Sequence, residues 1–169
     1  MHFEELDPDS IREAINQRQS FQALLEIEAD LTRRFAGSMR YAERGGHTYL
    51  LRRRGKSRSD TSLGPKNPEN DALLERFQVG KLERQGKVDG LRKQIEARRK
   101  LILAYGLGRM PTVSARILRQ LNAVGWLGTK LVVVGTNALY AYEAAAGVRI
   151  MGGALATLDI DILHDVRRR

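Results

Sequence analysis

The chain reads LVVVGTNALYAYE over residues 131–143, and this stretch decides how its C-terminal part folds. The valine-rich run predicts a buried strand, Lys130–Val134, because short apolar runs of β-branched residues favour β structure. Gly135-Thr136 then predicts a tight turn, and Asn137 is expected to cap a helix that continues to about Ala146. Such a turn can hold a phosphate, because glycine lets the backbone approach closely and a helix start offers free N–H donors. Many strand–glycine–helix turns serve packing alone.

A second stretch, LDIDIL at residues 158–163, predicts a strand that carries two carboxylates. Residues two apart on a strand point to the same side, so Asp159 and Asp161 are expected to lie together, opposite their apolar neighbours. Adjacent carboxylates repel, and a hard divalent cation such as Mg²⁺ or Mn²⁺ removes that repulsion. An isolated pattern of this kind also fits a solvated edge strand. Here one expected helix separates it from Gly135, so both can meet at one sheet edge, as phosphoryl and nucleotidyl transfer require.

Together the two stretches carry a family resemblance. The chain resembles the nucleotidyltransferase-fold family of the DNA polymerase β superfamily in VVGTNALYAYEAAAGVRI, residues 133–150, and ATLDIDIL, residues 156–163. It is most similar to a bacterial family of nucleotidyltransferase-like proteins of undefined substrate. The basic hairpin that precedes the core in that family is similar to YLLRRRGKSRSDTSLGP, residues 49–65.

The resemblance implies an enzyme that transfers a nucleoside monophosphate from an NTP to an unknown acceptor hydroxyl. Asp159 and Asp161 match the catalytic metal ligands for Mg²⁺ or Mn²⁺, and Gly135 and Thr136 match the phosphate-side turn. Asn137 is expected to contact the nucleotide beside them. Thr136 departs from the Gly or Ser that is usual at its position. The superfamily also uses a third carboxylate on a later strand. Because the sequence ends shortly after Asp161, we expect an incomplete core with weak or no activity.

The charge distribution supports a different interpretation. The net charge is +9, and residues 38–66 hold eight basic and two acidic residues. Within them, five side chains are candidates for contacts to a nucleic-acid backbone, with Tyr41 and Tyr49 available to stack on bases: Arg52, Arg53, Arg54, Lys56 and Arg58. The same run also fits a solvated strand face. The alternative function is therefore a basic module that binds RNA or another polyanion without catalysis. A dinucleotide binder is a third hypothesis, disfavoured because the G-x-G-x-x-G pattern is missing.

The expected fold class is α+β. It consists of N-terminal helices over residues 4–18 and 20–36, a small antiparallel β-meander, a long helix from Asn67 to about Tyr105 and an incomplete αβαβ core. The corresponding segments are 1–37, 38–66, 67–108 and 109–169. The sequence has no apolar run of bilayer length, no secretion signal and no cysteine, which predicts a cytoplasmic protein.

Overall fold

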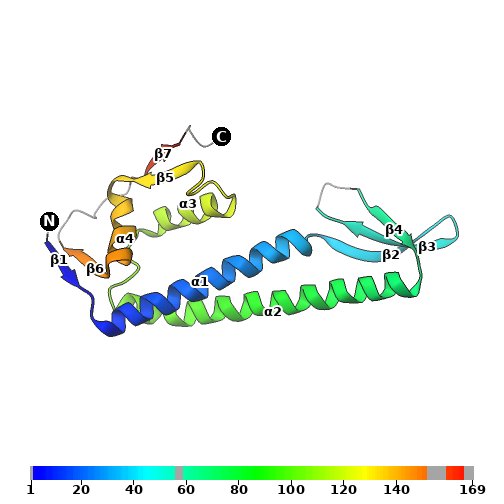
Figure 1. The fold of residues 1–169 in the computed structure, drawn as a ribbon, viewed down its shortest axis with the longest axis horizontal. Helices are drawn as coiled ribbons and strands as arrows, with labels where there is room; N and C mark the ends of the chain where they lie inside the picture. The colour runs from blue at the N-terminus through cyan, green and yellow to red at the C-terminus, as the bar shows by residue number, and fades with distance from the viewer. Residues whose placement is uncertain (1, 56–58, 152–158, 166–169) are drawn as a thin grey trace. The chain divides into compact units, whose positions relative to one another are not determined.

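The computed structural model describes residues 2–55, 59–151 and 159–165. It has the α+β fold expected from the sequence (Figure 1). The helices are α1 (Pro8–Arg34), α2 (Pro68–Ala104), α3 (Thr112–Ala123) and α4 (Gly135–Ala146). The strands are β1 (His2–Glu5), β2 (Ser38–Arg44), β3 (His47–Arg53), β4 (Thr61–Pro65), β5 (Leu131–Val134), β6 (Val148–Met151) and β7 (Asp161–His164). Two compact units result: residues 17–98, and residues 1–16 together with 99–169.

Helix α1 differs from the expectation of two N-terminal helices. It is one continuous helix, because Gln19 and Ser20 are tolerated inside a helix and the Ser20 side chain is buried. Its start is fixed by Asp7, whose carboxylate accepts hydrogen bonds from the backbone N–H groups of Asp9 and Ser10. The preceding residues form strand β1 instead of the first helical turn.

In the unit of residues 17–98, α1 and α2 lie side by side (Figure 1). Ion pairs join them between Asp30 and Arg84, at 2.5 Å, and between Glu28 and Arg92, at 2.6 Å. Helix α2 has the bounds that the sequence predicted, despite its internal glycines. Its buried residues Phe77 and Val88 contribute to a core that also contains Leu24, Leu50 and Leu51.

The predicted meander is confirmed as an antiparallel sheet in the order β2-β3-β4. Strands β2 and β3 pair without interruption from Ser38↔Arg53 to Arg44↔His47, and Gly45-Gly46 forms the turn between them. The β3–β4 ladder shifts register between Leu50 and Leu51. Because side chains alternate along a strand, the regular β2–β3 pairing decides which residues share a face.

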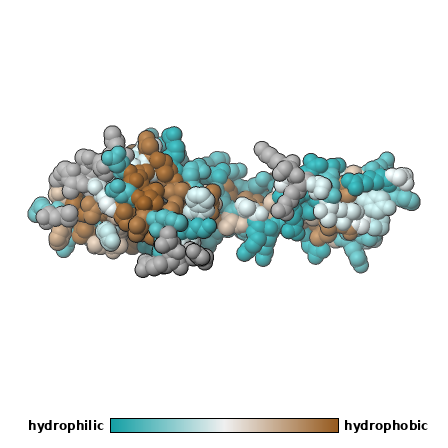
Figure 2. Space-filling view, turned by 90° about the horizontal axis from the view of Figure 1, so that it is seen from above, coloured by the Kyte–Doolittle hydropathy of each residue, from teal (hydrophilic) through white to brown (hydrophobic). Residues whose placement is uncertain are grey.

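The other unit contains two separate two-stranded sheets. Strand β5 pairs antiparallel with β7, and β1 pairs antiparallel with β6. The buried carboxylate of Glu143 in α4 accepts hydrogen bonds from the backbone N–H of Ile150 and from Arg109, which ties α4 to β6. Figure 2 shows hydrophobic side chains gathered over the part of the molecule that carries α3 and β5.

Among the helices in the described part of the chain, none has the length and apolar character needed to cross a bilayer.

Candidate functional site

The turn between β5 and α4 is built on Gly135. Its φ of +64° lies in the left-handed region, which a residue with a side chain adopts only at a cost. Helix α4 begins at Gly135 itself, with Val134 in extended conformation before it and no side-chain cap. The expectation that Asn137 caps this helix is therefore wrong, since Asn137 lies inside the first turn. In the described part of the chain, no side chain consequently caps the first-turn N–H groups of α4.

Asp161 lies directly against this turn. The register of the β5–β7 pair places it opposite Val134, the last residue of β5. A Cβ added at Gly135 would overlap Oδ2 of Asp161 and would lie 3.1 Å from its Cγ. The carboxylate of Asp161 thus occupies the space that any side chain at position 135 would need. The structure brings together the glycine turn and this carboxylate, which are far apart in the sequence.

A hydrogen bond from the side chain of Asn137 links the backbone of Asp159 to the same turn. The side chain of Asn137 is 1% exposed, and its Nδ2 donates a 2.5 Å hydrogen bond to the backbone carbonyl of Asp159. Strand β7 begins at Asp161, and Asp159 and Ile160 before it are not in a strand, so the expectation that both carboxylates lie on one strand is wrong. Leu158 lies outside the described residues. Asp159 is exposed and precedes β7. Its position is therefore fixed by the buried amide as well as by the sheet that follows.

We expect Asn137→Ala to lower the free energy of unfolding by about 1–3 kcal/mol, because it removes a buried amide and its hydrogen bond to the carbonyl of Asp159. The change removes no atom from the solvent-facing side of the turn. Urea unfolding followed by circular dichroism measures the loss. The matched control is Asn122→Ala, an exposed asparagine in α3, which should change stability by no more than about 0.5 kcal/mol. An equal effect of the two substitutions would contradict the anchoring role of Asn137.

The carboxylates of Asp159 and Asp161 are suitable ligands for a small divalent cation. Both residues are exposed, and both offer the hard oxygen atoms that Mg²⁺ and Mn²⁺ prefer. Among the described residues, no group of three or more His, Cys, Asp or Glu side chains is placed to hold a metal ion. Mg²⁺ is commonly held by one or two carboxylates, with waters and substrate phosphates as the other ligands. The chemistry of the two side chains therefore fits the cation that the sequence predicts.

The predicted nucleic-acid contacts lie in the other unit, and those that the structure describes, Arg52, Arg53 and Arg54, have different surroundings. Arg52 is buried, with its guanidinium 4.2 Å from the centre of the Phe77 ring, and it donates to the Arg34 carbonyl. Burial lowers the pKa of Arg52, with a further contribution from the charge of Arg54. Arg52 thus packs against α2, and its guanidinium does not face solvent.

The remaining residues of that set lie in different surroundings. Arg53 donates a 2.7 Å hydrogen bond to Asp60, and Arg54 is exposed. Lys56 and Arg58 lie outside the described residues. Of the predicted stacking residues, Tyr41 donates to Asp71 of α2 at 2.6 Å, and burial together with this bond raises its pKa to about 12.

Sequence reasoning missed the supporting roles of Asn137 and Glu143. A polar residue within a helical stretch is expected on the solvent side, whereas both side chains are buried against backbone groups of other segments. Their proximity to Gly135 and Gly147, at the two ends of α4, was the one available signal.

Comparison with known proteins supports the resemblance in this part of the chain. Residues 112–169 match a protein family described as nucleotidyltransferase. The match begins at α3 and includes Gly135, Asp159 and Asp161, but it does not include the basic hairpin. No curated protein and no solved structure gave a significant match.

Proposed function

We propose that residues 112–169, the nucleotidyltransferase-family segment of this chain, bind an NTP with a divalent cation and transfer its nucleoside monophosphate to an acceptor hydroxyl. The observation that carries the proposal is the close approach of the Asp161 carboxylate to Gly135. A phosphate-binding turn and a metal-binding carboxylate must be neighbours for this chemistry, because the cation and the turn act on the same triphosphate.

The nucleotide phosphates would approach the start of α4. The first-turn N–H groups together with the helix dipole favour negative charge there. The half-buried Thr136 adds a hydroxyl donor at the same helix start. These groups bind and orient the triphosphate, which lowers the entropic cost of bringing it to the acceptor.

Asp159 and Asp161 would hold the cation beside the phosphates. A bound Mg²⁺ or Mn²⁺ supplies charge neutralisation at the transferring phosphoryl group. Asn137 positions the backbone of Asp159, and the pairing of β7 with β5 positions Asp161. The backbone at Asp159 is thus held by a buried amide, and the backbone at Asp161 by strand pairing.

A binding assay tests the proposal without knowledge of the acceptor. Fluorescent NTP analogues should bind the native chain in the presence of Mg²⁺ and lose at least about tenfold in affinity when EDTA is added. Asp159→Ala should cause a similar loss, because it removes one of the two ligands. The matched control, Asp89→Ala, removes an exposed carboxylate from α2 and should leave binding unchanged.

Radiolabelled NTPs offered with RNA, protein and small-molecule acceptors then report the transfer step. Metal-independent binding, or binding that Asp159→Ala leaves intact, would contradict the proposed site. Transfer of the label in the native chain, with loss in Asp159→Ala, is the expected result.

A further inference from the structure

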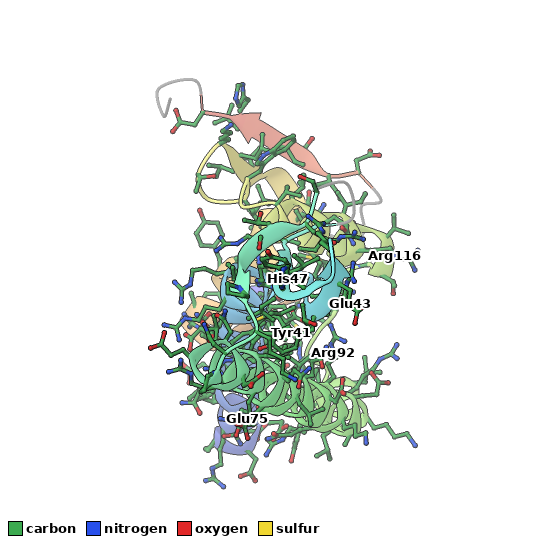
Figure 3. All side chains as sticks on the ribbon, turned by 90° about the vertical axis from the view of Figure 1, so that its right-hand side faces the viewer. Tyr41, Glu43, His47, Glu75, Arg92 and Arg116 are labelled. Atoms are coloured by element: carbon green, nitrogen blue, oxygen red, sulfur yellow. The ribbon has the colours of Figure 1, made fainter. Side chains whose placement is uncertain are left out.

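The meander of β2, β3 and β4 has two chemically different faces. Tyr41 and Arg52 belong to the face that packs on α2, through Asp71 and the ring of Phe77. Figure 3 views this end of the molecule and labels Tyr41 and His47, and the bond from Tyr41 to α2 fixes the direction of the first face. Side chains alternate along a strand, so the residues next to Tyr41 and Arg52 in the regular β2–β3 ladder point away from α2.

We define the outer face of the meander by Arg40, Arg44, His47 and Arg53. All four are exposed, and the register pairs Arg44 with His47 and places Arg40 and Arg53 near the other end of the ladder. In Figure 2 the end of the molecule that carries the meander is mostly hydrophilic. The outer face therefore carries exposed cations on the regular β2–β3 ladder, while Leu51, which shares this face and is paired with Arg40, is buried.

The carboxylate of Asp60 forms ion pairs with two of these arginines. Asp60 accepts from Arg40 at 2.9 Å and from Arg53 at 2.7 Å, and its own side chain is only 8% exposed. The side chains of Arg40 and Arg53 remain 52% and 46% exposed, so both guanidinium groups are held in place while still facing solvent. Hydrogen bonding from Arg53 lowers the pKa of Asp60 most, and the charges of Arg40 and Arg44 lower it further.

The outer face therefore keeps a surplus of positive charge. Asp60 is ion-paired with two of the arginines, and the charge of the third, Arg44, acts on it from the hairpin end of the ladder. The second acidic residue of the meander, Glu43, belongs to the face toward α2. Arginines fixed in this way lose less side-chain entropy on binding than free surface cations do. The planar guanidinium also matches the geometry of a phosphate group.

We propose that the outer face binds the phosphate backbone of a nucleic acid, through Arg40 and Arg53, which are ion-paired with Asp60, and through Arg44 at the hairpin end. Charge complementarity selects this partner, since a nucleic-acid strand presents repeated phosphates to a row of cations. Membrane-surface binding usually adds apolar insertion, and in the described part of the meander Leu63 alone is an exposed large apolar residue. The inference concerns residues 17–98 and does not depend on nucleotidyl transfer by the other unit.

The test uses the full chain and fluorescein-labelled single-stranded RNA of mixed sequence, with anisotropy measured across a range of salt concentrations. The variant Arg44→Gln/Arg53→Gln leaves Asp60 paired with Arg40. It should weaken binding by roughly tenfold or more, and the salt slope should fall by about 1.4, at roughly 0.7 for each phosphate that is no longer neutralised. The control Lys87→Gln/Lys93→Gln removes the same charge from exposed positions of α2 and should have little effect.

The single variant Arg44→Gln serves as a second measurement if the double variant unfolds, and its slope should fall by about 0.7. DNA of the same sequence should respond in the same way, because phosphates and not bases are recognised. The proposal is overturned if native protein fails to bind either nucleic acid, or if the control variant loses as much affinity as the test variant. Tighter association with phosphatidylserine vesicles or polyglutamate than with RNA would also overturn it.

Discussion

Calorimetric titration of Mn²⁺ into the Asp161→Ala variant should show no binding heat, whereas the native chain should bind the ion. Asp161 is one of the two proposed metal ligands and lies against Gly135, and Mg²⁺-type sites with few protein ligands lose affinity sharply when one is removed. In the proposed transfer reaction the expected loss of charge stabilisation is several kcal/mol, which corresponds to roughly 10³-fold or more in rate. This is the largest effect we expect from any single substitution in the chain.

Thermal unfolding provides an independent measurement of the same prediction. Mn²⁺ at about 100 times its Kd should stabilise the native chain by about 2.7 kcal/mol, since the ion binds the folded state. Asp161→Asn keeps the size of the side chain and removes its charge, so it should fold normally without this stabilisation. Asp89→Ala, in α2, should behave as native. Undiminished Mn²⁺ binding by both Asp161 variants would contradict the proposal that Asp161 is a ligand of the divalent cation.

The second large effect is expected from Gly135→Ala. A side chain at φ +64° costs roughly 1–2 kcal/mol, and the new Cβ also meets the Asp161 carboxylate. Either the carboxylate rotates away or β7 shifts from β5, and both movements displace a proposed metal ligand. We therefore expect a loss of stability together with a loss of at least about tenfold in Mn²⁺ and NTP affinity.

Gly125→Ala is the matched control for this substitution. Gly125 has a φ of +72°, but no heavy atom lies within 4 Å of the position that its Cβ would take. The control shares the backbone strain and lacks the clash, so it should lose a similar amount of stability, roughly 1–2 kcal/mol, and keep its affinity for the ion. If both variants retain Mn²⁺ binding equally, the close approach of Gly135 and Asp161 has no functional role.

The sequence by itself determined the local elements and the chemistry of the candidate site. Helical periodicity predicted α2 with its bounds, paired glycines predicted the β2–β3 turn, and the LVVVGT and DID patterns identified the turn and the carboxylates. These features are set by interactions between residues close in the chain, so they can be predicted locally. The family match over residues 112–169 confirms the resemblance on which those roles were based.

The tertiary structure alone decided which residues meet. The pairing of β1 with β6 joins segments from opposite ends of the chain, and the four residues of β1 carry no local signal for it. Three further contacts could not be predicted from nearby residues. They are the packing of Arg52 on the Phe77 ring, the ion pairs of Asp60 with two arginines, and the hydrogen bond from Asn137 to Asp159. Each is a polar residue whose sequence context predicts exposure. Long-range packing instead supplies a partner that offsets the cost of removing it from water, and only the folded chain provides that partner.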